Sequence, residues 1–184
     1  KVMLNVKNLA ITFFNQEEKT WNEAVHQVSF NLEKGKVLGI VGESGSDLER
    51  GLDSMTYVTS TNYLNSIGSD FIRTDALFAV VFISDELDQS SEFGNSNSAD
   101  FIKSLNVRKP AFENGARGWI ANYIGILTNQ SCDNLGGYVA IGTQFIRLVD
   151  ESGGAKSSIC NADLSAAVSN IKARIVDQIT AYRF

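Results

Sequence analysis

At 184 residues, the chain fits one domain, and its 43% hydrophobic and 20% charged residues are enough for a packed core and exclude wholesale disorder. The net charge of −5 argues against a nucleic-acid partner, because phosphate binding needs an excess of Lys and Arg. No apolar run reaches the roughly 20 residues of a membrane span, so we expect no membrane insertion. The sequence also shows no segment in which charged residues precede an apolar run, so we expect no export signal. One histidine and two cysteines exclude a zinc site rich in these residues.

The first 41 residues read as three strands separated by polar turns. Residues 2–14 are rich in β-forming residues, and residues 25–32 alternate apolar with polar side chains, which is typical of strands with one face in water. Residues 37–41 (VLGIV) are wholly apolar, as expected for a strand that is covered on both faces. We therefore expect an antiparallel hairpin followed by a buried strand.

A glycine-serine turn at residues 42–46 precedes a predicted helix over about residues 47–65. Ser46 is the expected N-cap of this helix, and Glu49 would complete a capping box. The helix would pack through Leu48, Leu52, Met55 and Val58. The further predicted elements, in chain order, are a strand at 76–83, a short helix at 100–105, a strand at 119–127, a helix at 139–151, a strand at 155–159 and a helix at 163–182. The helix at 139–151 is expected to stop at a glycine pair. The helix at 163–182 is amphipathic, with its apolar face at Leu164, Val168, Ile171 and Ile175.

Strands and helices alternate from residue 37 onward, a pattern typical of a parallel sheet with helices on both faces. The expected fold class is α/β: one domain over residues 1–184, with a three-layer, Rossmann-like arrangement. Its mixed sheet would be mostly parallel, with four parallel strands in sequence order and the N-terminal antiparallel hairpin at one edge. Sites in such folds lie at the carboxyl ends of the strands, here residues 42–47, 84–88 and 128–133.

Residues 1–46, through LNVKNLAITF and AVHQVSFNLEKGKVLGIVGESGS, resemble the start of the ATPase subunit of ABC transporters. The resemblance implies the beginning of a phosphate-binding loop for an anion or a nucleotide, at Gly42, Glu43, Ser44, Gly45 and Ser46. The family continues with Gly-Lys-Ser, whereas this chain has Asp47-Leu48-Glu49. A lysine is replaced and two carboxylates are added at the phosphate position, so we expect no productive ATP binding. The alternative for this segment is a tight turn capped by side chains and water.

Residues 45–184 resemble a bacterial von Willebrand factor A domain, through GSDLERGLDSM, FIRTDALFAVVFISDELDQSS and GTQFIRLVDESGGAKSSICNADLSAAVSNI. The resemblance implies a divalent-cation site, in which Asp85 matches the Asp after the fourth strand. The family's Asp-x-Ser-x-Ser motif is absent, but the turn can be laid on it, with Gly42 at the place of the Asp and Ser44 and Ser46 as the hydroxyls. One hypothesis for the acidic residues after the strand at 76–83 is a weak Mg²⁺ or Ca²⁺ site formed by Ser44, Ser46 and Asp85. The alternative hypothesis is a solvated acidic loop at Asp85, Glu86 and Asp88.

The two resemblances meet at the turn over residues 42–46, so we interpret the chain as a chimera, natural or engineered. We expect no catalysis and no cofactor beyond a weakly bound Mg²⁺ or Ca²⁺. A non-catalytic von Willebrand A-like module with an unidentified protein partner is the first functional hypothesis, and an ATPase-derived nucleotide or phosphate binder is the second. The A-like segment implies an exported parent protein, and the ABC-like segment a cytoplasmic one.

Cys132 and Cys160 are either free thiols or a disulfide. We favour a disulfide, because both residues lie in loops that flank predicted neighbouring elements and because an exported parent domain would explain it. His26 is expected at the surface, on the polar phase of its strand. Phe13 and Phe14 are expected to pack in a core rather than to stack on an adenine.

Overall fold

The computed structural model describes residues 2–15, 19–33, 39–41, 50–66, 71–90, 98–129, 132, 140–161 and 163–183. Backbone contacts divide the chain into two compact units, Lys1–Lys36 and Val37–Phe184. The single domain over residues 1–184 stays a prediction.

The first unit contains an antiparallel hairpin of β1 (Val2–Asn15) and β2 (Thr20–Glu33). The pairing register shifts between Val6 and Leu9, where Asn8 takes a left-handed backbone conformation with φ of 49°. Asn is one of the few residues besides Gly that adopts this conformation readily. Its N–H donates to Ser29 Oγ at 2.9 Å, so a hydrogen bond to β2 stabilises β1 at the register shift. Among the described strands these two form a sheet of their own, so the predicted place of the hairpin at the edge of the parallel sheet is not confirmed.

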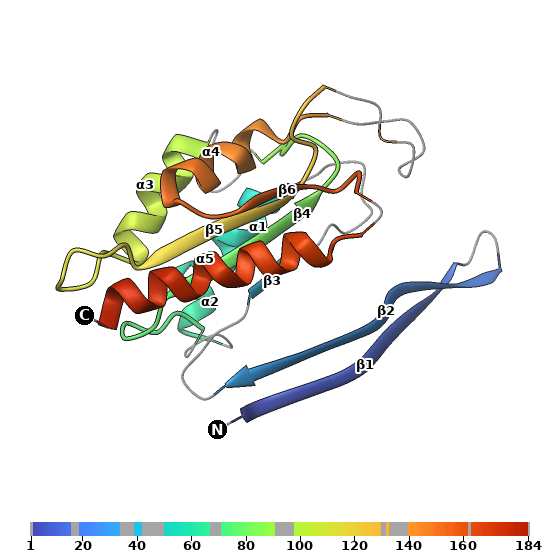
Figure 1. Cartoon of the computed structure of the whole chain (residues 1–184), viewed down its shortest axis with the longest axis horizontal. Helices are drawn as coiled ribbons and strands as arrows, with labels where there is room; N and C mark the ends of the chain where they lie inside the picture. The colour runs from blue at the N-terminus through green and yellow to red at the C-terminus, as the bar shows by residue number, and fades with distance from the viewer. Residues whose placement is uncertain are drawn as a thin grey trace. The chain divides into compact units, whose positions relative to one another are not determined.

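The second unit alternates strands with helices, as predicted (Figure 1). Its elements are β3 (Gly39–Val41), α1 (Gly51–Val58), α2 (Thr61–Leu64), β4 (Phe78–Ser84), α3 (Ser98–Arg108), β5 (Trp119–Gly125), α4 (Thr143–Ser152), β6 (Lys156–Ser158) and α5 (Ser165–Arg183). The helix predicted at 139–151 corresponds to α4, which begins later than predicted, at Thr143. It ends where Gly153 adopts a φ of 71°, a left-handed conformation that glycine takes without steric cost.

The sheet of this unit has the order β3-β4-β5-β6, and every neighbouring pair is parallel. Val41 pairs with Phe82, which confirms that the strand predicted at 37–41 lies beside the one predicted at 76–83. The buried side chain of Asn122, in β5, links β4 to the residue that precedes β6, since its Nδ2 donates to Val80 O at 3.2 Å and its Oδ1 accepts from the Ala155 N–H at 3.0 Å. These bonds satisfy a buried amide and fix the register of β4, β5 and the start of β6.

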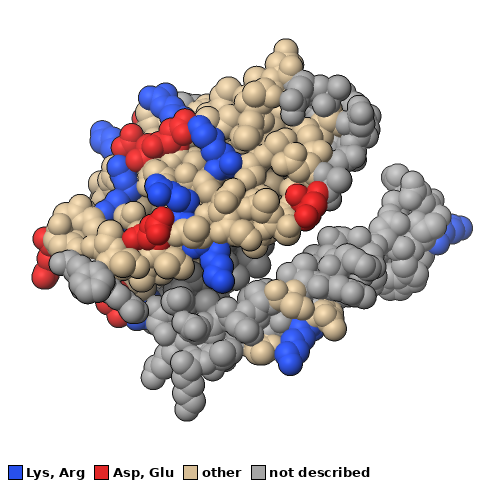
Figure 2. All heavy atoms as spheres, in the orientation of Figure 1, with Lys and Arg blue, Asp and Glu red and all other residues tan. Residues whose placement is uncertain are grey.

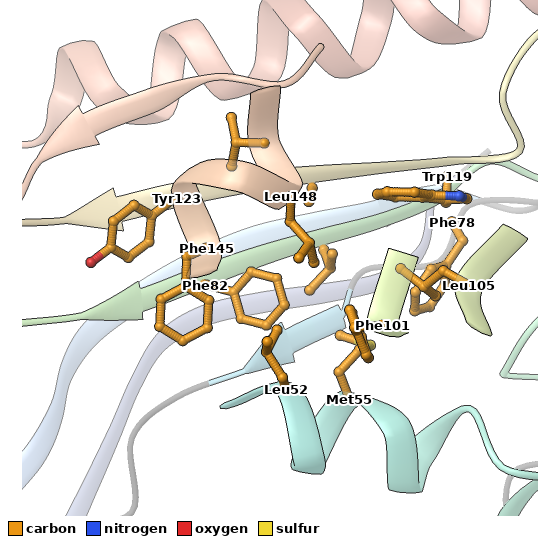
Figure 3. Packing of buried hydrophobic residues seen from close by; sticks show 13 residues of the cluster. Leu52, Met55, Phe78, Phe82, Phe101, Leu105, Trp119, Tyr123, Phe145 and Leu148 are labelled. Carbon is orange, nitrogen blue, oxygen red and sulfur yellow. The ribbon is translucent and has the colours of Figure 1, made fainter. Parts of the chain in front are cut away.

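One face of the sheet packs against α1, α3 and α4 through a large aromatic and aliphatic cluster (Figure 3). Alternate residues of β4 and β5 face this cluster, because successive side chains of a strand point to opposite faces. Phe82 and Phe145 stack with ring centroids 4.7 Å apart, and both are buried. The cluster consists of Leu52, Met55, Phe78, Val80, Phe82, Phe101, Leu105, Trp119, Ala121, Tyr123, Phe145, Leu148 and Val149.

The other face packs against α5, which runs along the sheet in Figure 1. Its smaller cluster consists of Ile124, Ala155, Ala167 and Ile171, with Val81, Ile159, Leu164 and Ile175 packed against it. The prediction placed Val168 in this contact, but Val168 is 60% exposed and Ala167 takes its place. Positions 164, 167, 171 and 175 form one stripe of a helix with 3.6 residues per turn, and residue 168 lies to the side of it.

The helix predicted at about 47–65 is interrupted in the structure. Ser60 caps α2, because its Oγ accepts from the Tyr63 N–H at 3.2 Å. The hydroxyl of Thr59 donates to Met55 O at 2.9 Å at the end of α1. Such side chains compete with the backbone for hydrogen bonds, which favours a break at this point. The predicted contacts of Leu52, Met55 and Val58 are confirmed, while Leu48, Ser46 and Glu49 lie outside the described residues.

Candidate functional site

The carboxyl ends of the parallel strands lie at one edge of the sheet, where β3 ends at Val41, β4 at Ser84 and β5 at Gly125. This is the edge at which the sequence predicts a site. Asp85 follows β4 directly and its side chain is half-buried. The other predicted site residues, Gly42, Glu43, Ser44, Gly45 and Ser46, lie outside the described residues.

The backbone around Asp85 is held by hydrogen bonds from three directions. Tyr123 Oη donates to Ser84 O at 3.1 Å, and the Ala140 N–H donates to Asp85 O at 3.2 Å. The Glu86 N–H donates to Ser84 Oγ at 3.1 Å, which closes a tight turn. The turn after β4 is therefore anchored to β5 and to the segment before α4.

The buried ring of Tyr123 occupies the space beside two glycines at this edge. A Cβ added to Gly125 would lie 2.0 Å from the Tyr123 ring, and one added to Gly142 would lie 2.1 Å from its hydroxyl. Either approach is a severe clash, so both positions need glycine for close packing. The tyrosine, which the sequence analysis did not single out, thus supports the turn that carries Asp85.

Asp88 and Ser90 accept hydrogen bonds from two N–H groups in the first turn of α1. The Leu52 N–H donates to Asp88 Oδ1 at 3.0 Å, and the Asp53 N–H donates to Ser90 Oγ at 2.8 Å. The N-cap residue itself, Arg50, makes no such bond with its side chain, and its guanidinium instead pairs with Asp53 at 2.7 Å. The loop after β4 therefore caps a helix that precedes it in the sequence.

Burial raises the pKa of Asp88 above its ordinary value, although the N–H groups of Leu52 and Ser90 and the Ser90 hydroxyl oppose the shift. Its second oxygen, Oδ2, accepts from the Ser90 N–H at 3.2 Å. Both carboxylate oxygens are therefore engaged within the protein. The reading of Asp88 as part of a solvated acidic loop is wrong, because this side chain is half-buried and caps α1.

The described residues of this edge do not supply the ligands of a cation by themselves. In the described part of the chain, no three His, Cys, Asp or Glu side chains converge in a way that could hold a metal ion. Mg²⁺ and Ca²⁺ prefer six or more oxygen ligands that include carboxylates. A site at Asp85 would depend on Ser44 and Ser46 and on water.

A disulfide joins Cys132 and Cys160, which confirms the predicted bridge. It spans 28 residues of sequence and brings the two Cα atoms to 5.2 Å. Cys132 lies in the segment after β5 and Cys160 in the turn after β6, so the bridge links the chain beyond two neighbouring strands at the same edge as Asp85.

The surface of the second unit carries charges of both signs. Figure 2 shows basic and acidic side chains interspersed over the face that is in view. Within the described segments, no helix is both long enough and apolar enough to cross a bilayer.

Comparison with known proteins gives a similarity to the ATP-binding subunit of a transporter. This relative is the oligopeptide transport ATP-binding protein OppF of Streptococcus mutans, which is 46% identical to the chain over 46 residues. Those residues make up 25% of this chain and 15% of OppF, so the chain spans a small part of that relative. The match supports the predicted ABC ATPase-like segment, and the comparisons give no support for the von Willebrand A-like segment. No model of a protein family matches the chain, and no solved structure matches it.

Proposed function

We propose that the chain is a non-catalytic binding module of the von Willebrand A-like kind, with an incomplete divalent-cation site at the carboxyl edge of its parallel sheet. The observation that carries the proposal is the place of Asp85. It directly follows β4, a strand with parallel neighbours on both sides, and its backbone is fixed by the Ala140 N–H. Ligand sites of open parallel sheets are found at this edge.

The strand register supports a contribution from the end of β3. Val41 pairs with Phe82, and Ser44 stands as far beyond Val41 in sequence as Asp85 stands beyond Phe82. Two hydroxyls and one carboxylate are few ligands for a hard cation, and water would have to supply the rest. We therefore expect weak binding, with a dissociation constant in the millimolar range.

The described polar groups of the edge support a binding role rather than a catalytic one. The Ser84 and Tyr123 hydroxyls hold the turn after β4, and the Asp88 carboxylate holds the start of α1. A catalytic nucleophile needs a neighbouring base to activate it, whereas these groups are engaged with the backbone.

Calorimetric titration with Mg²⁺ and with Ca²⁺ tests the proposal. The wild-type protein should show weak, saturable binding, and Asp85→Asn should abolish it by removing the carboxylate ligand. Glu86→Gln is the matched control, because it removes the adjacent charge but no predicted ligand, and it should retain binding. Absence of saturable binding at millimolar cation, or equal binding by wild type and Asp85→Asn, would contradict the proposal.

A second candidate function is nucleotide or phosphate binding by the ABC ATPase-like segment. The 46% identity to OppF over 46 residues favours it. Against it stand Asp47 and Glu49, two carboxylates that replace the family's Gly-Lys-Ser at the phosphate position. We expect no saturable Mg-ATP binding below millimolar concentration and no phosphate release. Measured ATP hydrolysis that Ser46→Ala abolishes would favour this alternative instead.

The proposal includes a chimeric origin, in which an ABC-like strand replaces the first strand of the A-like sheet. The parallel pairing of β3 with β4 supports that replacement. Sequencing of a natural gene that contains residues 1–46 and 47–184 in one reading frame would identify the chimera as natural. It would leave the cation and nucleotide tests unchanged.

A further inference from the structure

A hollow of about 800 Å³ lies at the amino ends of β4 and β5, at the opposite end of the strands from Asp85. This volume is within the range of about 300–1,000 Å³ that is typical of small-molecule sites. Three segments of chain form its wall: α2, the residues before β4, and the last residue of α3 with the residues that follow it. Apolar side chains of Leu64, Ile72, Ala111 and Phe112 line much of it, together with the cations Arg108 and Lys109.

Arg108 lines the hollow and its guanidinium is anchored through Nη1, while Nε and Nη2 form an open edge, which makes no hydrogen bond to a described residue. Its Nη1 donates to Thr56 O at 3.0 Å and to Thr59 Oγ1 at 2.7 Å. Among the described residues, neither Nε nor Nη2 donates a hydrogen bond, and no carboxylate pairs with this arginine. Nε and Nη2 form the edge of a guanidinium that binds a carboxylate through two parallel hydrogen bonds.

Lys109 adds positive charge, and two of its three N–H donors are engaged by backbone carbonyls. Its Nζ donates to Arg73 O at 2.6 Å and to Thr74 O at 2.9 Å, and it lies 4.9 Å from the centre of the Phe112 ring. The residue is 3% exposed, so its charge acts in an environment that screens it less than water does. Lys109 therefore favours an anion in the hollow mainly through its charge, because most of its donors are engaged by the backbone.

Two carboxylates also line the hollow, and neither occupies the open edge of Arg108. Asp75 accepts from Arg73 Nε at 3.0 Å and from Arg73 Nη2 at 2.6 Å, which compensates its charge. Glu113 keeps its charge at a position exposed to solvent, so with Asp75 paired, the two cations Arg108 and Lys109 exceed the remaining lining carboxylate by one charge.

We propose that this hollow binds a small monocarboxylate with an aromatic or aliphatic body. The Nε–H and Nη2–H of Arg108 donate to its two oxygens, and Leu64, Ile72 and Phe112 contact its apolar part. One open guanidinium edge matches the single charge and planar shape of a carboxylate. A doubly charged phosphate would need more donors than this edge offers. The proposal is independent of the cation site at the opposite end of the sheet.

Two-dimensional amide NMR with pairs of probes tests the site. The probes are phenylacetate, 4-phenylbutyrate and octanoate, each compared with its neutral carboxamide. At least one acid should bind about tenfold or more tightly than its amide, since only the acid accepts charge-assisted hydrogen bonds. The shifted amides should lie around residues 108–114 and not around Asp85.

Variants on α3 separate the open guanidinium edge from general positive charge. Arg108→Gln should remove the preference for the acid, and Arg108→Lys should restore only part of it, because an ammonium lacks the planar pair of donors. Lys103→Gln removes an exposed cation from the same helix and should leave binding unchanged. Circular dichroism checks the folding of each variant.

Three results would overturn the proposal: no acid binds at millimolar concentration, the acids and amides bind equally, or Lys103→Gln weakens binding as much as Arg108→Gln does. If Arg108→Gln does not fold, two measurements on the wild type still test the proposal. They are the affinity of each acid relative to its carboxamide and the positions of the backbone amide signals that shift on binding.

Discussion

The two faces of the parallel sheet are covered in different ways. On one face, α1, α3 and α4 bury a cluster rich in large aromatic side chains, such as Phe82 and Trp119. On the other, α5 packs through small and aliphatic residues such as Ala167 and Ile171. Burial of apolar surface stabilises a fold roughly in proportion to its area, so the first face should contribute more to the free energy of unfolding.

The two faces also differ in how well they cover neighbouring residues at the carboxyl end of β4. Phe82 is 1% exposed, whereas the next residue of β4, Ile83, is 41% exposed. Ile83 shares its side of the strand with Val81, which packs against the α5 cluster. In the described part of the chain, α5 thus leaves the carboxyl end of β4 partly open to solvent.

The largest expected effect tests this comparison directly. Phe82→Ala should lower the free energy of unfolding by about 3–5 kcal/mol, because it removes a buried ring and leaves a cavity. Ile83→Ala is the matched control on the adjacent position and should cost less than about 1 kcal/mol, since its side chain is already partly hydrated. Denaturant unfolding measures both. Similar losses in the two variants would mean that the faces contribute equally.

The second prediction concerns the disulfide beyond β5 and β6. Replacing both Cys132 and Cys160 by Ser should lower the free energy of unfolding by about 2–4 kcal/mol, because the bridge restricts the unfolded chain. Urea titrations of the variant and of the wild type, oxidised and reduced, measure the change. Reduction of the wild type should reproduce the variant. A reduced protein as stable as the oxidised one would contradict the prediction.

A third test concerns the contact of α5 with the sheet. Ile171→Ala should cost about 2 kcal/mol, at the low end for such substitutions, because α5 covers its face with a small cluster. Val168→Ala, one position away and 60% exposed in the wild type, should change the free energy of unfolding by less than about 0.5 kcal/mol. A larger effect at Val168 than at Ile171 would contradict the observed contact, in which Ala167 and Ile171 face the sheet and Val168 faces solvent.

The smallest expected effect is the pH dependence from Asp88, which caps α1 on the first face. Its pKa in the native state is raised by burial from an ordinary value of 3.8, so the native protein holds this proton more tightly than the unfolded chain does. This contribution favours the folded state at low pH and is lost as the pH rises from 3.8 through the higher native pKa.

Asp88→Asn should keep an oxygen acceptor for the Leu52 N–H and remain within about 1 kcal/mol of the wild type at neutral pH. Relative to the wild type, the variant should gain stability as the pH rises through that window. NMR titration of the Asp88 carboxyl carbon measures the native pKa. A midpoint at or below 3.8 would contradict the expected direction.

The regular elements of the second unit could be predicted because each has a strong local pattern. The apolar run of β4 predicts a buried strand, and the glycine pair after α4 predicts the end of a helix, without knowledge of the fold. The parallel pairing of β3 with β4 followed from the alternation of strands and helices. The disulfide followed from two loop cysteines beside neighbouring elements, and its geometry needed the structure.

The features that escaped prediction depend on contacts between distant segments. Asp88 and Ser90 form an Asp-x-Ser pattern typical of a turn, but sequence alone does not show that α1 lies beside it. The break after Thr59 had a signal in the run Thr59-Ser60-Thr61, whose hydroxyls compete with helical hydrogen bonds. The hairpin pairing was readable from alternation, whereas its relation to the sheet was not.

The capping of α1 from the loop after β4 has a consequence for the order of folding. The acceptors for the Leu52 and Asp53 N–H groups lie 36 and 37 residues further along the chain, so α1 has them only after β4 and its following turn are in place. Short helices are only marginally formed in isolation. Helix α1 should therefore form late in folding, after the transition state in which the central strands come together. Substitutions at its cap should accelerate unfolding more than they slow refolding.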